Sequence, residues 1–145
     1  MDLHLLTAEQ VTELWPQLES IYDASCASNE IVHADATATQ IYLLAQTGMC
    51  GIFAAMEKDR VVCTVALRFC EVNGNKGAEI LGMGGRNLMK VKAYFWQPIL
   101  DWLCANGATF LDTYANQRLA NIYLKKFGFN KSCTYVRMDL QVSNV

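Results

Sequence analysis

The sequence lacks the signals that mark a membrane protein, a nucleic-acid binder or a metal site. No apolar run reaches the roughly 20 residues that span a bilayer, and the first ten residues lack the regions of a secretion signal. Lysine and arginine form no run, and the net charge is −2. The cysteines are not closely paired, and His4 and His33 have no partner nearby in sequence. We therefore expect a cytoplasmic protein with reduced core cysteines, no metal, no membrane contact and no nucleic-acid partner.

Apolar residues are plentiful enough for one packed core. Of the 145 residues, 52% are hydrophobic and 18% are charged, so we expect a single globular domain over residues 1–145. Thr7 with Gln10, and Thr37 with Gln40, have the spacing of a capping box. They predict one helix that starts at Thr7 and a second that runs to Gly48.

Three apolar runs follow, and short polar turns separate them. Residues 51–59, 60–72 and 77–85 predict three strands, and the two turns make neighbouring strands antiparallel. Residues 91–107 have the apolar spacing of a helix, 108–116 predict another strand, and 117–129 predict a last helix closed by Gly128. The alternation of apolar and polar residues over 132–140 predicts a half-buried final strand.

This order of elements predicts an α/β fold with a mixed, mostly antiparallel sheet and helices on both faces. A helix-length segment separates the strand over Glu79–Gly84 from the strand over Thr109–Ala115. A hairpin cannot contain such a segment, so we expect these two strands to form one parallel pair in a βαβ unit.

The C-terminal part of the chain resembles the Gcn5-related N-acetyltransferases. ANIYLKKFGF contains a Lys-x-Gly-Phe signature at Lys126 to Phe129, between a strand that ends at Asn116 and a segment containing VRMDL. GMGGRN lies where that family places the loop that binds the pyrophosphate of acetyl-CoA. More narrowly, GGRNL before an aromatic-rich helix resembles acetyltransferase-like proteins of tailed bacteriophages.

The resemblance implies acetyl-CoA as co-substrate and a set of residues that bind it. Arg86 follows two glycines whose amides suit an anion, and Lys90 adds a nearby positive charge. The residues implied for cofactor binding are Leu81, Met83, Gly84, Gly85, Arg86, Lys90 and Asn116. Lys90 and Lys92, the two lysines near this loop, could also be ordinary surface residues. Asn116 could instead cap the helix that follows it.

The resemblance also implies Glu79 and Tyr123 as catalytic residues. Glu79 lies where the family often places a general base, although a place at a solvated strand edge would also explain it. Tyr123 could donate a proton to the CoA thiolate, or could belong to the core, since it lies on the apolar face of its helix. The family's acidic tyrosine position itself carries Leu124, and the loop lacks the family's second and third small residues.

Two functions therefore follow from the sequence. The first is an acyl-CoA-dependent N-acyltransferase that acetylates an amine of a small molecule or protein, with a homodimer left open. The second is a non-catalytic protein of the same fold, such as a bacteriophage structural or assembly protein, with virion proteins as partners. We expect the acyltransferase in the cytoplasm, which would be that of the host cell for a phage protein. We expect the non-catalytic protein in the virion.

Overall fold

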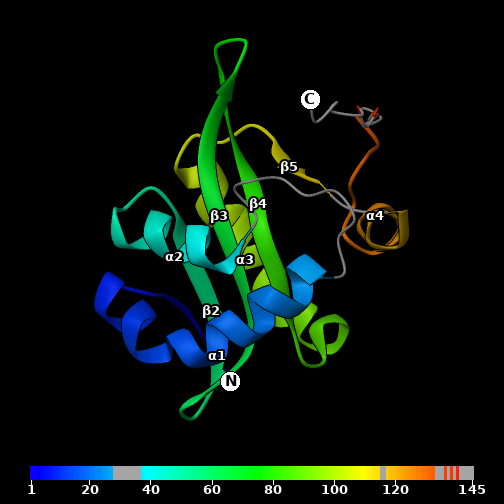
Figure 1. Ribbon diagram of the computed structural model, residues 1–145. Coiled ribbons are helices and arrows are strands. Elements are labelled where there is room, and N and C mark those ends of the chain that lie inside the picture. Colours follow the sequence, from blue (N-terminus) through cyan, green and yellow to red (C-terminus); the bar gives the residue numbers. More distant parts are fainter. Residues whose placement is uncertain (28–36, 115–116, 133–135, 137, 139, 141–145) are drawn as a thin grey trace, which may run out of the picture.

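The protein is described here by a computed structural model, which covers residues 1–27, 37–114, 117–132, 136, 138 and 140. It forms an α/β sandwich around one twisted sheet (Figure 1). Helices α1 and α2 lie in front of the sheet, and α3 lies behind it. The elements follow in the order β1 (Asp2–Leu5), α1 (Ala8–Ala27), α2 (Ala38–Gln46), β2 (Gly51–Glu57), β3 (Arg60–Val72), β4 (Asn75–Gly85), α3 (Leu88–Ala105), β5 (Leu111–Thr113) and α4 (Gln117–Lys126).

The sheet has five strands in the order β1-β2-β3-β4-β5, and its last pair is parallel. Ala78 lies opposite Leu111, Glu79 opposite Asp112, and Ile80 opposite Thr113. All other neighbouring strands are antiparallel. The predicted mixed sheet with one parallel pair is therefore confirmed, although β5 is shorter than the sequence suggested.

Local sequence signals set most of the element ends. Thr7 and Gln10 bond to each other's backbone amides at 2.9 and 3.2 Å, as a capping box requires. The Thr37 hydroxyl accepts from the Gln40 amide at the start of α2. The turn between β3 and β4 is formed by Asn73 and Gly74, both with positive φ, which suits the twist of a hairpin. Because of this turn, β4 begins two residues earlier than predicted, at Asn75.

Strand β1 is absent from the predicted set of elements. It pairs antiparallel with β2, and Leu3 lies opposite Ala55. Four residues are too few for a clear alternation, and its partner is distant in sequence, so only the tertiary structure reveals it. None of the described helices is both long enough and apolar enough to cross a bilayer.

Each face of the sheet has its own apolar cluster. Tyr22 of α1 is fully buried on the front face, where its hydroxyl lies 2.7 Å from Thr64 Oγ1. Thr64 in turn donates to the carbonyl oxygen of Phe53 at 2.8 Å, so Tyr22 is the donor to Thr64. The back face packs against α3 through Val91, Phe95, Trp96, Ile99 and Leu103.

Some predicted core positions are exposed. Cys104 lies at the surface, so it is not the core cysteine that the sequence suggested. The predicted final strand over 132–140 lies largely outside the described residues. Its described apolar residues, Val136, Met138 and Leu140, are exposed rather than half-buried.

Candidate functional site

Strand β4 has an open edge beyond its short pairing with β5. The parallel pairing ends at Ile80, and beyond it no strand of the described residues pairs with β4 on that side. Opposite, on β3, Ala66 pairs with Gly82 and Leu67 with Ile80, so Leu81 is an extra residue in a β-bulge. The backbone from Leu81 onward thus offers hydrogen-bonding groups along one side, next to the start of α3. The side chains of Leu81 and Met83 are buried.

Gly84 and Gly85 belong to the strand rather than to a loop. They lie opposite Thr64 and Cys63 of β3. A Cβ on Gly84 would lie 3.1 Å from the Ile21 side chain of α1. Gly85 has φ +134°, and a Cβ there would lie 2.2 Å from the carbonyl oxygen of Val62. Close packing therefore excludes a side chain at both positions. The interpretation of these glycines as an anion-binding turn did not include this cause.

The start of α3 carries the groups best suited to an anion. The Arg86 amide already donates to Val62 O at 2.8 Å, which anchors the turn to β3. Asn87 is left-handed, with φ 55°, and its side chain makes no capping bond. The first amides of a helix have no acceptor within the helix, and the side chains of Arg86 and Lys90 are exposed beside them. These first amides of α3, together with the side chains of Arg86 and Lys90, could hold an anion.

Lys92 has a structural contact instead. Its ammonium group donates to the carbonyl oxygen of Lys126 at the end of α4. It also lies 4.9 Å from the centre of the Phe127 ring. Lys92 thus ties α3 to the C-terminal end of α4, where carbonyl groups favour a positive charge.

Glu79 is paired with a cation. It lies on β4 between β3 and β5, not at a sheet edge, which corrects the solvated-edge interpretation. The Arg68 Nη2 atom lies 3.3 Å from Glu79 Oε1 and 3.5 Å from Oε2. Both side chains are about a quarter exposed, at 24% for Arg68 and 22% for Glu79. The carboxylate thus contacts a cation and is still partly exposed, so an entering molecule can reach it.

Tyr123 lies in the aromatic core behind the sheet. Its ring contacts Phe127 and Phe129, with centroids 5.7 and 5.1 Å away. Burial raises the pKa of its hydroxyl, and a side-chain hydrogen bond with Thr113 offsets part of that effect. Leu124 is exposed. Tyr123 packs with the back-face cluster that includes Ala78 and Ile80, so the Glu79 side chain, which alternates with these two, lies on the other face of the sheet. Asn116 lies outside the described residues.

Cys70 lies close to Glu79 on the same face of the sheet. Burial raises the pKa of its thiol, and the charges of Glu79 and Asp112 raise it further. A thiol of raised pKa is protonated at neutral pH and is a poor nucleophile. Among the residues that the structure describes, no three histidine, cysteine or acidic side chains gather where they could hold a metal ion.

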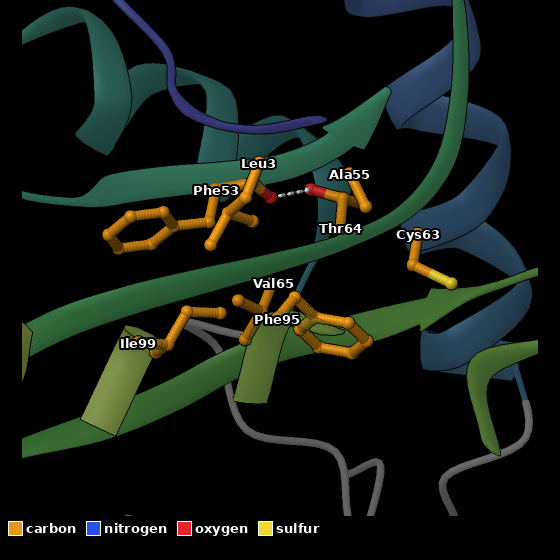
Figure 2. A pocket seen from close by; sticks show the side chains of 8 residues that line it. All are labelled: Leu3, Phe53, Ala55, Cys63, Thr64, Val65, Phe95 and Ile99. Atoms are coloured by element: carbon orange, nitrogen blue, oxygen red, sulfur yellow. Dashed lines mark hydrogen bonds between the residues drawn. The ribbon is translucent and has the colours of Figure 1, made fainter. Parts of the chain in front are cut away.

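A gap between α3 and the sheet is too small for a cofactor. Figure 2 shows its lining and the hydrogen bond that Thr64 gives to Phe53. It leaves essentially no room even for a water molecule, whereas ligand pockets usually measure about 300–1,000 Å³. The residues that line it are Leu3, Phe53, Ala55, Cys63, Thr64, Val65, Phe95 and Ile99. It is a packing gap, so the open edge of β4 is the candidate site.

Solved acetyltransferases share this fold. An aminoglycoside acetyltransferase from an uncultured soil metagenomic sample, solved in complex with sisomicin, has a TM-score of 0.67 at 11% identity, over 97% of this chain and 96% of that one. The ribosomal-protein-alanine N-acetyltransferase of Brucella melitensis biovar Abortus 2308 has a TM-score of 0.66 at 15% identity, over 96% and 100%. A predicted acetyltransferase of Clostridium acetobutylicum, solved with acetyl-CoA, has a TM-score of 0.65 at 13% identity, over 95% of each chain.

Structural similarity at identities this low shows the fold alone. It confirms the fold class inferred from the sequence. No protein-family model and no curated protein matches the sequence. The narrower resemblance to bacteriophage proteins receives no support from these three neighbours.

Proposed function

We propose that this protein is an acyl-CoA-dependent N-acyltransferase that moves an acetyl group from acetyl-CoA to an amine. The open edge of β4 carries this proposal, because it joins Glu79 at one end to the start of α3 at the other. An extended ligand with amide groups can pair with such an edge, and a phosphate suits a helix N-terminus with cations beside it. The acceptor is the amine of a small molecule or of a protein.

Different residues of the site bind different parts of acetyl-CoA. Arg86 and Lys90 neutralise the phosphates, and the first amides of α3 bond to their oxygens. The backbone at Leu81 and Met83 borders the extended pantetheine arm, and we propose Asn116 for the same arm. Acetyl-CoA supplies the thioester as the activated acyl donor.

Glu79 supplies the base. An amine is protonated at neutral pH, so the carboxylate first takes a proton from its nitrogen. The nitrogen lone pair then forms a bond to the acyl carbon, the carbon–sulfur bond breaks, and the sulfur leaves with the bonding electrons. The acylated nitrogen gives up its second proton to the departing thiolate or to water, which completes the amide. A thiolate whose parent thiol has a pKa near ~8.5 leaves readily, so Tyr123 with its raised pKa is not needed as an acid.

A second candidate is a non-catalytic protein of this fold, such as a bacteriophage structural or assembly protein. It is favoured by the exposed Leu124 at the family's tyrosine position and by the engagement of Tyr123 with Thr113. Such a protein would neither bind acetyl-CoA nor release CoA. Its partners would be virion proteins, whereas the enzyme would act in the cytoplasm, as a monomer or a homodimer.

Isothermal titration with acetyl-CoA separates the two candidates. The enzyme is expected to bind acetyl-CoA, and to release free CoA with at least one amine from a panel of small amines and peptides. Absence of both binding and CoA release overturns the enzyme proposal. Binding without release from any amine in the panel favours a cofactor-binding protein that has lost catalysis.

A further inference from the structure

The guanidinium group of Arg68 holds the carboxylate that the proposed reaction uses. Arg68 lies opposite Glu79 in the β3–β4 register, so both side chains are on the front face of the sheet. One nitrogen, Nη2, contacts both carboxylate oxygens, at 3.3 and 3.5 Å. Because the pair is only partly buried, solvent screens its contribution to stability. The contact then restricts where the carboxylate lies.

A second carboxylate makes this restriction necessary. Asp112 of β5 lies opposite Glu79 in the parallel register. Burial is the main cause of the raised pKa of Cys70, and the charges of Glu79 and Asp112 add to it, so both carboxylates lie near this thiol. Two neighbouring carboxylates repel each other. Without the Arg68 cation, the Glu79 side chain would be free to turn away from Asp112 and from the sheet.

The position of Glu79 along β4 places the Arg68–Glu79 pair next to the candidate site. Glu79 directly precedes Ile80, the last residue that pairs with β5. A carboxylate held there lies beside the opening of the candidate site. Catalytic groups must be held close to the reacting atoms, since a displacement of about 1 Å can cost about 10²-fold in rate.

We propose that Arg68 is a positioning residue for Glu79 and does not itself touch the substrate. This inference rests on the proposed acyltransferase function, because it gives Arg68 a role in the step that Glu79 performs. It predicts that Arg68 affects turnover only through the carboxylate of Glu79. Binding of acetyl-CoA, at the other end of the open edge, does not depend on it.

A double-mutant cycle on CoA release tests this role. Arg68→Met is expected to lower kcat about tenfold and to leave KM for acetyl-CoA unchanged. Arg68→Lys, which keeps the charge but not the planar fork, should recover part of the loss. In the Glu79→Gln background, Arg68→Met should cost nothing further. Arg60→Met, at an exposed position on the same strand, is the matched control and should behave like the parent.

Three outcomes overturn the inference. Arg68→Met with the parental kcat, losses that multiply in the double variant, or a change confined to KM for acetyl-CoA would each show that Arg68 does not act through Glu79. A parent that releases no CoA with any amine overturns the proposed function as well, so the two failures are distinguishable. Thermal unfolding checks each variant; if Arg68→Met does not fold, Arg68→Lys and Arg68→Gln replace it, and parental kcat in both overturns the inference.

Discussion

The thiol of Cys63 donates a hydrogen bond to the carbonyl oxygen of Arg86, 3.2 Å away, where β4 turns into α3. Cys63 is buried, and it lies opposite Gly85 in the β3–β4 register. The turn that carries the proposed phosphate contacts is thus tied to the sheet through this thiol and through the bond from the Arg86 amide to Val62.

The stability of the fold should fall in alkaline solution because of Cys63. Burial raises the pKa of its thiol to about 11, whereas a thiol in the unfolded chain ionises near ~8.5. Between these values the unfolded state has lost the proton that the folded state keeps, so stability decreases as pH rises. We expect thermal unfolding of Cys63→Ala to depend less on pH over this range than that of the parent. Cys104→Ala, at an exposed position, is the control, and equal pH dependence in parent and Cys63→Ala would contradict the prediction.

Gly85→Ala should be strongly destabilising. Its φ of +134° is unfavourable for an L side chain, and the new Cβ would lie 2.2 Å from Val62 O and 2.6 Å from Cys63 Cα. We expect a loss of about 3 kcal/mol or more in the free energy of unfolding, measured with urea. Gly48→Ala is the matched control, because Gly48 also has positive φ but no atom within 4 Å of the place that a Cβ would take; it should cost about 1 kcal/mol. Similar losses at both sites would show that β3 can move away from Gly85.

Arg86→Ala should weaken acetyl-CoA binding by about 1 to 3 kcal/mol, the usual worth of a charge-assisted hydrogen bond. The side chain is exposed at the start of α3, and its removal leaves the backbone anchor to Val62 intact. Lys92→Met is the contrasting variant, since Lys92 contacts Lys126 and Phe127. It should lower the melting temperature and leave affinity unchanged in a calorimetric titration. The reverse pattern would place the anion site nearer Lys92.

Glu79→Gln should lower kcat for CoA release by about 10²-fold, within the usual range for loss of a general base. Tyr123→Phe should change kcat much less, because burial raises the pKa of Tyr123 and its hydroxyl bonds to Thr113. The loss of that hydrogen bond should appear as lower thermal stability instead. A rate loss at Tyr123 equal to that at Glu79 would return the acid role to the tyrosine.

Local signals in the sequence were sufficient to predict most of the helices and turns. Thr7, Thr37, Gly107 and Gly128 mark helix ends through contacts within a few residues, so a sequence pattern reveals them. The parallel pairing of β4 with β5 follows from the length of the segment between them.

The chemistry around Glu79 depends on strand register, which the sequence does not specify. The bulge at Leu81 shifts the pairing of β4 with β3, and the resulting register places Arg68 opposite Glu79. The family resemblance assigned the glycines before Arg86 to an anion-binding loop, yet close packing against α1 and β3 also selects glycine. Only the contacts in the folded structure distinguish these two causes.

The contact of α1 with Gly82 and Gly84 of β4 has a consequence for how this protein can vary. A Cβ on Gly82 would lie 2.9 Å from the Tyr22 ring, and one on Gly84 would lie 3.1 Å from Ile21. Helix α1 therefore occupies the space that side chains of β4 would otherwise fill. A larger residue in α1 at this contact finds no side chain on β4 that a second substitution could shorten. Substitutions at this contact are consequently restricted to α1. A residue of α1 can be replaced by one of equal or smaller size, while the two positions of β4 must remain glycine.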